Sequence, residues 1–341
     1  VCSSDLVVDA DGARVLSLGE VARPVFPRSA IKAIQALPLI ESGAADRFSL
    51  GERELALACA SHNGEPDHVA TAARMLNLAG LDASALRCGA HWPMHQPAAQ
   101  ALAREGAAAG ALHNNCSGKH AGFLCTACAL DADRERYFEP EHPVQRLVKG
   151  TLESLTGAVI APESCAVDGC SVPTWAVPLD ALALAFARFG SGSGLAKERA
   201  KAAARLCAAC AAQPWHVAGT RRYCTEIMRQ FGARIFVKTG AEGVACAALP
   251  EQGFGIAIKC DDGTGRAAEV AMAATLSRLL TATSDRAALD PFARRDLRNW
   301  NGVSVGAVRP AEALGWIGPK SEEHTSELQS LAYLVCRLLL E

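Results

Sequence analysis

The spacing of apolar and polar residues changes twice along this chain. Residues 7–18 alternate around Asp11-Gly12, which predicts a β-hairpin. Apolar positions then recur at helical spacing, and alternation returns near residue 233. The expected helices span residues 29–41, 52–59, 69–78, from about 98 onward, 143–155, 194–212 and 266–282, and the expected strands span 233–239, 243–249 and 254–259. Strands near both ends with helices between them predict an α+β fold, an antiparallel β-sheet packed against a helical cluster.

The two ends of the chain differ in composition from the rest. Residues 1–6 and 319–341 lack the alanine and glycine richness of the intervening sequence and resemble translated sequencing-adapter sequence. We expect both segments to be non-native and leave them out of the predicted fold, as one sets aside an expression tag. The predicted catalytic domain therefore covers residues 7–318.

Composition favours a globular protein and argues against two classes of partner. The chain has 341 residues, 50% of them hydrophobic, and a formal net charge of −2. That length allows a substantial core. Because the sequence has no basic cluster, we expect neither nucleic acid nor an anionic membrane as a partner. No apolar run approaches the ~18 residues of a membrane span and no signal peptide is visible, so we expect a soluble, cytoplasmic protein.

Fourteen cysteines are unusual for that compartment. They are spread through alanine-rich sequence and do not frame a small secreted domain, which argues against a disulfide scaffold. Cys125 and Cys128, like Cys207 and Cys210, have a spacing used in zinc ribbons and redox motifs. Both pairs lie in alanine-rich helical runs. We therefore expect them to be reduced and to pack as small apolar side chains.

Ser29 and Lys32 form the first candidate catalytic pair. Residues three apart on a helix share a face, and apolar residues flank this pair on both sides. A serine hydroxyl needs a neighbouring base to become a nucleophile, and a desolvated lysine can take that proton. Only eight of the 34 basic residues are lysines, so a lysine in this position is not readily explained as surface charge.

Two further motifs follow in chain order. Ser61-His62-Asn63 supplies a second serine, and Lys238-Thr239-Gly240 ends an expected strand. Ser-x-x-Lys, Ser-x-Asn and Lys-Thr-Gly in this order are typical of penicillin-binding proteins and β-lactamases. Lys238 and Thr239 offer donors to an oxyanion or a carboxylate. Gly240 would let a substrate lie against the strand edge.

Cys116 and Lys119 form another pair three residues apart, and Asp168 and Cys170 follow about fifty residues later. Two thiolates and a third ligand around an open position would suit zinc. A lysine ligand must be neutral, which requires strong desolvation or the metal itself. Spacing alone therefore favours packed cysteines beside a loop over a metal site.

Histidine offers an alternative source of chemistry. Six histidines lie within the first 120 residues, but only His91 and His95 are four apart, and Pro93 and Pro97 argue against a helix there. We expect loop residues, not ligands. A Ser-His-Asp triad stays open because its members can be distant in sequence, although the sequence has no Gly-x-Ser-x-Gly elbow.

Several segments together resemble one known family. They are Pro27–Lys32, Ala60–Glu65, Cys88–Pro93, Asn115–His120, Glu141–Gln145, Asp168–Cys170 and Lys238–Gly240. In this order they resemble the bacterial L-asparaginase II family of the Rhizobium type, from about Val7 to Pro310. The resemblance implies hydrolysis of L-asparagine to L-aspartate and ammonia. It also implies a fold similar to serine β-lactamases and glutaminases, and a homodimer.

The resemblance further implies roles for individual residues. Ser29 with Lys32, and Ser61 with Lys238, would be two catalytic Ser-Lys pairs. Zinc would bind Cys116, Lys119 and Cys170, while the predicted substrate contacts are Asn63, Asp168, Thr239 and Gly240. On this ground we prefer a zinc site to packed cysteines. Family members begin with an additional segment before the position of Val7, so we expect this chain to fold or react less well than its parent.

We hypothesise that neutral Lys32 deprotonates Ser29, which attacks the side-chain amide carbon; ammonia leaves and water then releases aspartate. Ser61 and Lys238 would pass a proton to the leaving nitrogen, and zinc would orient the substrate or organise the pocket. One alternative is a glutaminase or penicillin-recognising hydrolase, which acylation of Ser29 by a β-lactam would favour. Another is a zinc-dependent binding or sensor protein, which stoichiometric zinc without ammonia release would favour.

Overall fold

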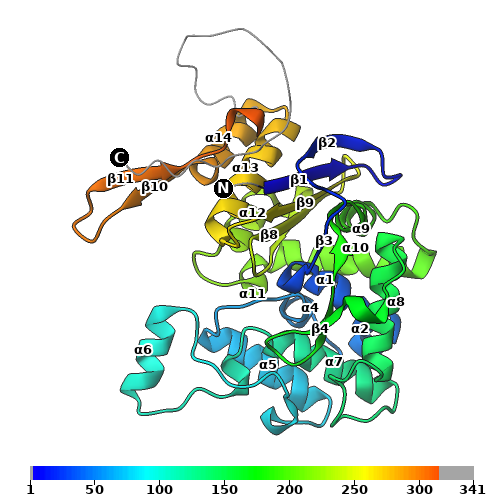
Figure 1. Cartoon of the computed structure of the whole chain (residues 1–341). Helices are drawn as coiled ribbons and strands as arrows, with labels where there is room; N and C mark the ends of the chain where they lie inside the picture. The colour runs from blue at the N-terminus through cyan, green and yellow to red at the C-terminus, as the bar shows by residue number, and fades with distance from the viewer. Residues whose placement is uncertain (1–2, 315–341) are drawn as a thin grey trace.

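Five antiparallel strands form the main sheet, in the order β2-β1-β9-β8-β7 (Figure 1). The computed structural model describes residues 3–314. The strands of the sheet are β1 (Ser3–Val8), β2 (Arg14–Leu18), β7 (Phe236–Thr239), β8 (Val244–Leu249) and β9 (Phe254–Cys260). Every residue of β8 is buried, so both faces of the sheet are covered, and α9 (Leu179–Ser191) and α13 (Gly265–Leu279) pack against it. The predicted α+β fold is confirmed.

Most of the remaining helices form a cluster below the sheet in Figure 1. The other helices are α1 (Lys32–Gln35), α2 (Leu37–Glu41), α3 (Ala44–Arg47), α4 (Glu52–Ala58), α5 (Pro66–Leu78), α6 (Gln96–Arg104), α7 (Ser117–Ala129), α8 (Pro143–Thr156), α10 (Lys197–Ala212), α11 (Pro214–Val217), α12 (Tyr223–Phe231) and α14 (Thr283–Ala293). Short strand pairs join β3 (Pro24–Val25) to β6 (Val177–Pro178), β4 (Cys165–Val167) to β5 (Pro173–Trp175), and β10 (Arg295–Arg298) to β11 (Ser304–Val308).

The N-terminal hairpin is confirmed, but it begins earlier than predicted. Residues 3–6, which we left out of the fold, belong to β1, and every residue of β1 is buried. Ser3 through Val8 pair with Cys260 through Gly255 of β9, so β1 lies between β2 and β9. Segment 3–6 is therefore a structural part of the sheet whatever its origin. The domain boundary at residue 318 and segment 319–341 lie outside the described residues.

The single helix predicted over residues 29–41 is wrong. A 3₁₀ turn, η1 (Arg28–Ile31), is followed by α1, which ends just before Ala36, and by α2, which begins just after it. Pro38 lies in the first turn of α2, where its missing N–H costs little, but it cannot continue a preceding helix. Ser29 therefore lies in the 3₁₀ turn and Lys32 begins α1, so the two do not share one regular helix.

Helix α7 is nearly all buried and carries the predicted cysteine-lysine motif at its start. A Cβ atom at Gly118 would lie 2.4 Å from the Leu57 carbonyl oxygen, so only glycine allows α7 to pack this closely against α4. The chain reaches Ser61 directly after α4. This contact brings the first turn of α7 beside the Ser61 segment.

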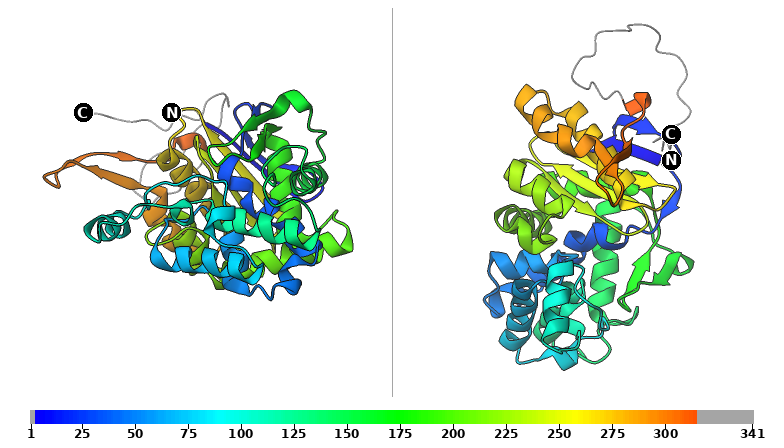
Figure 2. Two further views of the ribbon diagram at one scale, coloured as in Figure 1. Left: turned by 90° about the horizontal axis from the view of Figure 1, so that it is seen from below. Right: turned by 90° about the vertical axis from the view of Figure 1, so that its left-hand side faces the viewer.

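The sequence patterns missed elements near the C-terminal end of the described chain. The hairpin β10–β11 projects from the body, as the left view of Figure 2 shows, and Trp300 in its turn is fully exposed. Its strands are mostly exposed, so they lack the in-out alternation that identifies a core strand. Among residues 3–314, no helix is long and apolar enough to cross a membrane.

Candidate functional site

Three lysines of the predicted site are buried, one each in α1, α7 and β7. Lys32, Lys119 and Lys238 are each at most 2% exposed, and lysine is almost never buried without a partner. The Lys32 Nζ donates to the Cys116 Sγ at 3.0 Å and to the Asn115 carbonyl oxygen at 3.4 Å. The two residues that hold the Lys32 amine thus come from the start of α7, 83 and 84 positions along the chain.

Ser29 lies half-buried in η1, close to Lys32 in sequence. Within residues 3–314 its hydroxyl makes no hydrogen bond, and the Lys32 amine is directed to Cys116 instead. The described structure therefore shows no direct hydrogen bond within the predicted pair, and the pairing stays a prediction. Catalytic hydrogen bonds often form only in the complex with substrate.

Arg28, a residue that the sequence analysis missed, links η1 to two other segments. Its guanidinium donates to Asp168 Oδ1 from Nε at 3.0 Å and from Nη2 at 2.7 Å, and it pairs with Glu242 in the β7–β8 turn. Arg28 has a φ of 50°, an uncommon value for a residue other than glycine. Burial raises the pKa of Asp168, but the Lys119 and Arg28 cations lower it further, so the net shift is downward. Asp168 is thus held as a carboxylate whose Oδ1 accepts from Arg28, and its predicted contact with substrate stays a prediction.

The Ser61 segment is fixed by backbone hydrogen bonds. Ser61 N donates to the Val217 carbonyl at 3.1 Å, and Asn63 N donates to the Ala218 carbonyl at 2.9 Å. The Asn115 side-chain Nδ2 donates to Ser61 Oγ at 3.2 Å. No hydrogen bond between Ser61 and Lys238 occurs in the described part of the chain. The pairing of Ser61 with Lys238 therefore stays a prediction.

Asn63 is engaged on both sides of its amide. Its Nδ2 donates to Glu65 Oε1 and to the Thr220 carbonyl, each at 3.1 Å, and its Oδ1 accepts from Arg222 at 3.0 Å. The buried Glu65 carboxylate also accepts from the Thr220 N–H and hydroxyl. Asn63 thus ties the Ser61 segment to the start of α12, and its predicted contact with substrate stays a prediction.

Lys238 lies in β7, and its Nζ donates to the Thr239 carbonyl at 3.0 Å. Burial lowers the pKa of Lys238 to about 8, with a smaller contribution from the positive charge of Lys32. Lys238 therefore changes its charge close to physiological pH. This is a property that general acids and bases require.

We predicted that Gly240 leaves room for a substrate at the strand edge, but in the structure the backbone of another segment occupies that space. A Cβ atom there would lie 2.5 Å from the Pro27 carbonyl oxygen and 3.1 Å from the Ala30 nitrogen. The space is filled by the backbone of the turn that carries Ser29, so Gly240 allows β7 to approach η1. Thr239 next to it accepts from or donates to the Cys224 thiol at 3.4 Å. Its contact with substrate stays a prediction.

We expect Gly240→Ala to destabilise the protein by about 1–3 kcal/mol and to lower its activity, because the new methyl group pushes η1 and Ser29 aside. Urea unfolding and a turnover assay measure the two effects. Gly150→Ala is the matched control, since Gly150 lies in α8 with open space around it and alanine favours a helix. Equal stability of the two variants would contradict the close approach.

Cys116, Lys119 and Cys170 do come together. The Lys119 Nζ donates to Cys170 Sγ at 3.0 Å. The Cys170 thiol, with the positive charges of Lys32 and Lys119, lowers the pKa of Cys116 well below its usual value, although burial opposes this. Burial lowers the pKa of Lys119, but the Cys170 and Cys116 sulfurs raise it more, so the net shift is upward. The cluster therefore holds the Cys116 sulfur as a thiolate near the Lys119 ammonium group and within hydrogen-bond distance of the Lys32 amine.

The Cys116 and Cys170 sulfurs and the Lys119 nitrogen are atom types that bind zinc. Two sulfurs and one nitrogen, buried and clustered, form the soft ligand set that zinc prefers, and a fourth position would remain for water or substrate. Over residues 3–314, no group of three His, Cys, Asp or Glu side chains is placed to hold a metal. A metal here therefore depends on Lys119 as the third ligand.

The remaining cysteine and histidine predictions can be compared with the structure. Cys125 and Cys128 lie in α7 and Cys207 and Cys210 in α10, all as free thiols in helices, as predicted. His91 is a loop residue that accepts a hydrogen bond from the Asn115 N–H at 2.9 Å. The ring of His68 stacks on Trp215 at 4.0 Å and on His62 at 4.8 Å. Burial lowers the pKa of His62 well below its usual value, so it is a neutral packed side chain.

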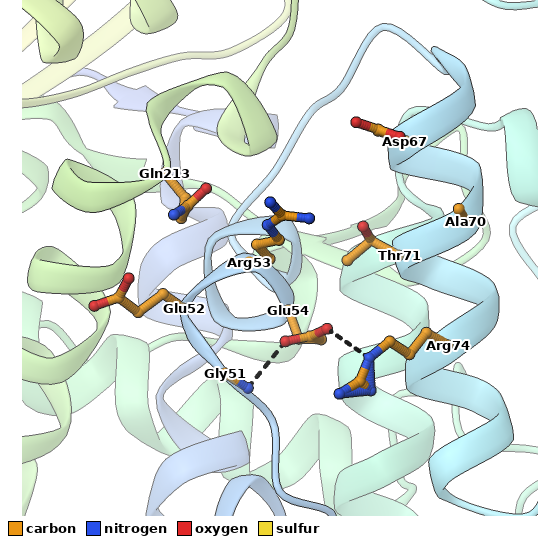
Figure 3. A pocket seen from close by; sticks show the side chains of 9 residues that line it. All are labelled: Gly51, Glu52, Arg53, Glu54, Asp67, Ala70, Thr71, Arg74 and Gln213. Atoms are coloured by element: carbon orange, nitrogen blue, oxygen red, sulfur yellow. Dashed lines mark hydrogen bonds and ion pairs between the residues drawn. The ribbon is translucent and has the colours of Figure 1, made fainter.

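A separate pocket of about 500 Å³ lies between α4 and α5 (Figure 3). Its lining includes Glu52, Arg53, Glu54, Asp67 and Arg74, and it includes none of the predicted site residues. As Figure 3 shows, the buried Glu54 carboxylate accepts from the Gly51 N–H and pairs with Arg74. This carboxylate therefore caps its own helix, at a distance from Ser29 in the fold.

The chain is similar to a known family in sequence and to a solved protein in structure. The sequence matches the L-asparaginase II family over residues 3–310. No curated protein matches the chain. Among solved structures, a β-lactamase from Mycobacterium bovis is similar, with 13% sequence identity, a TM-score of 0.34, and coverage of 77% of this chain and 88% of that chain. At that TM-score the likeness carries no argument about chemistry.

Proposed function

Because the chain belongs to the L-asparaginase II family, we propose that it hydrolyses L-asparagine to L-aspartate and ammonia with Ser29 as nucleophile. The family predicted from the motifs is confirmed, and it supports a hydrolase that acts on a small-molecule substrate. The match across residues 3–310 is the observation that carries the proposal. The burial of the Lys32 and Lys238 amines, and the hydrogen bonds by which Asn115 joins Lys32 to Ser61, support the choice of residues.

The chemistry follows from acyl transfer. Neutral Lys32 takes the proton of Ser29 as the serine oxygen attacks the amide carbon. The carbon–nitrogen bond then breaks, and its electron pair stays on nitrogen, which takes a proton from the Ser61 hydroxyl. Protonated Lys238 restores the Ser61 proton. Water attacks the acyl-enzyme, gives its proton to Lys238, and Ser29 regains its own from Lys32.

We propose Cys116, Lys119 and Cys170 as the ligands of a zinc ion. Such an ion supplies a positive charge that orients the α-amino and α-carboxylate groups of a substrate. Since Lys119 and Cys170 are both protonated in the arrangement described, zinc uptake must release protons and so weaken at low pH. The homodimer and the cytoplasmic location stay predictions.

The test is ammonia release from L-asparagine and from L-glutamine by the purified chain, with zinc measured on the same sample. We expect release from asparagine and about one zinc per chain. Turnover of glutamine in preference to asparagine would support the glutaminase alternative. Stoichiometric zinc without release from either amide would overturn the enzymatic proposal and support a binding or sensor protein.

The pKa of Lys238 predicts how kcat changes at alkaline pH. The pKa of Lys238 is lowered by burial to about 8, and the mechanism needs its ammonium form. We therefore expect kcat to fall as pH rises, with a midpoint near pH 8, whereas a lysine in water would stay protonated to about pH 10. Initial rates at saturating asparagine from pH 6 to 10 measure this. Lys238→Arg is the control, because arginine stays charged and its residual activity should lose the fall near pH 8.

A further inference from the structure

Asn115 joins the two serine-lysine pairs, although no motif singled it out as a site residue. It lies in the loop just before α7. Its backbone carbonyl accepts from Lys32 Nζ at 3.4 Å and from the His62 N–H at 3.2 Å. Its side-chain Nδ2 donates to Ser61 Oγ at 3.2 Å. One residue thus holds the base of the first pair with its main chain and the hydroxyl of the second with its side chain.

The Asn115 amide lies between Ser61 and His91. The His91 Nδ1 lies 2.7 Å from the Trp92 carbonyl, an acceptor, so Nδ1 carries the hydrogen and Nε2 of the neutral ring is an acceptor. The Asn115 backbone N–H already donates to that Nε2 at 2.9 Å. In the structure the Asn115 NH₂ faces Ser61, and its Oδ1 lies 3.4 Å from the same Nε2.

An incoming hydrogen bond determines what the Ser61 hydroxyl can do. Because Ser61 Oγ accepts from Asn115, its own hydrogen cannot point back along that bond. In the described structure the Ser61 hydroxyl donates to no protein group, so its hydrogen is available to a substrate. Ser61 is only 6% exposed, and a hydrogen bond is stronger in such a buried place than in water. The bond from Asn115 therefore constrains the direction of the Ser61 hydroxyl hydrogen.

We propose that Asn115 is a positioning residue that aims the Ser61 hydrogen at the leaving nitrogen. This inference rests on the proposed function, because the proton that Asn115 directs is the one that converts the departing amide nitrogen to ammonia. The hydrogen bond is the same in the ground state and the transition state, but the direction it gives Ser61 matters only when the carbon–nitrogen bond breaks. Loss of Asn115 should therefore lower kcat more than it raises KM.

Asn115→Ala tests this, since the hydrogen bonds from Lys32 and His62 go to the backbone carbonyl of residue 115 and are kept, while the side-chain contacts to Ser61 and to His91 Nε2 are lost. We expect kcat for asparagine to fall about tenfold to a hundredfold, within the range of general acid catalysis, with KM changed less than about threefold. In a Ser61→Ala background the same substitution should have no further effect. Asn115→Asp should also fail, because a carboxylate accepts the Ser61 hydrogen and turns it away from the substrate.

Asn114→Ala is the matched control. Asn114 is the preceding asparagine, and its side chain binds the Cys88 and Gly89 carbonyls and the Cys116 N–H, not Ser61. Its effect on kcat should be the same with and without Ser61. Labelling of Ser29 by a fluorophosphonate adds a second readout, because fluoride leaves without a proton. Asn115→Ala should be labelled at the wild-type rate if the nucleophile is intact.

Three outcomes overturn the inference. The first is a wild-type kcat in Asn115→Ala, and the second is an equal loss in the Ser61→Ala background. The third is a loss of Ser29 labelling that matches the loss of amide hydrolysis, which would indicate general disorder of the site. Absence of ammonia release from the wild-type chain is a separate result. It overturns the proposed function and the role of Asn115 with it, before any variant is compared.

Discussion

Ser29→Ala is expected to lower kcat for ammonia release from L-asparagine by about 10⁴-fold or more. Without the hydroxyl no acyl-enzyme forms, and the remaining donors can only bind the amide or polarise it. Ser29 is half-buried and makes no hydrogen bond within residues 3–314, so the substitution removes no structural contact of that kind. Steady-state ammonia release measures the effect, and circular dichroism checks that the fold is retained.

Two further variants separate the nucleophile from the metal site. Lys32→Met keeps the length of the buried side chain but removes the base, and we expect it to be nearly as inactive as Ser29→Ala. Cys116→Ser should lose less kcat and more substrate affinity, because the proposed zinc ion would orient the substrate. Full activity in Ser29→Ala or Lys32→Met would contradict the mechanism. A loss in Cys116→Ser as complete as in Ser29→Ala would contradict the division between nucleophile and metal.

Asp5→Asn is expected to stabilise the protein at pH 8 by up to about 4 kcal/mol. Asp5 is fully buried in β1, and neither of its carboxylate oxygens has a hydrogen-bond partner in the described structure. Burial raises the pKa of Asp5 from 3.8 to about 7, and the nearby Ser3 hydroxyl offsets only a small part of this. At 1.36 kcal/mol for each pKa unit, ionising the group in the folded state costs about 4 kcal/mol.

The sign of the pH dependence follows from proton binding. Between pH 3.8 and about 7 the folded chain holds a proton on Asp5 that the unfolded chain has lost, so this group makes stability fall as pH rises through that interval. The Asn variant lacks the fall. Urea unfolding of both proteins at pH 5 and pH 8 should show a larger difference at pH 8. Asp11→Asn, on the exposed turn of the same hairpin, is the control; an equal gain at both pH values would contradict the assignment to Asp5.

Asp5 also explains how segment 3–6 relates to the rest of the fold. The backbone of the segment pairs with β9, and backbone pairing tolerates many side chains. A carboxylate without a partner in the buried centre of a sheet is costly, and within residues 3–314 no cation pairs with Asp5. The structure therefore accommodates this segment by its backbone while its side chains fit poorly.

Local patterns predicted much of the architecture. The alternation of residues 7–18, with glycine at the turn, predicts the N-terminal hairpin, and Gly12 adopts the positive φ that such a turn requires. The strands β7, β8 and β9 were predicted within a few residues of their bounds. The helix over residues 29–41 was not, because helical periodicity continues across Pro38 while the backbone cannot. Hairpin β10–β11 was missed because its side chains are mostly exposed on both faces.

The sequence by itself determined which chemical groups the site contains and the family to which they belong. Ser29, Lys32, Ser61 and Lys238 could be named from short motifs, because each motif is local and its order along the chain is visible. Cys116, Lys119 and Cys170 could be named as zinc ligands only through the family resemblance. Spacing alone favoured packed cysteines.

Only the tertiary structure decided how these groups are connected. The Lys32 amine faces Cys116 and not Ser29, Arg28 binds Asp168, and Asn115 binds Ser61, across intervals of 54 to 140 residues. Such contacts depend on how closely helices and strands can approach, for example on the missing side chain of Gly240 against η1. Local propensity contains no information on that approach, because the energy that fixes it comes from packing between distant segments. The same packing sets the burial that lowers the pKa of Lys238 to about 8.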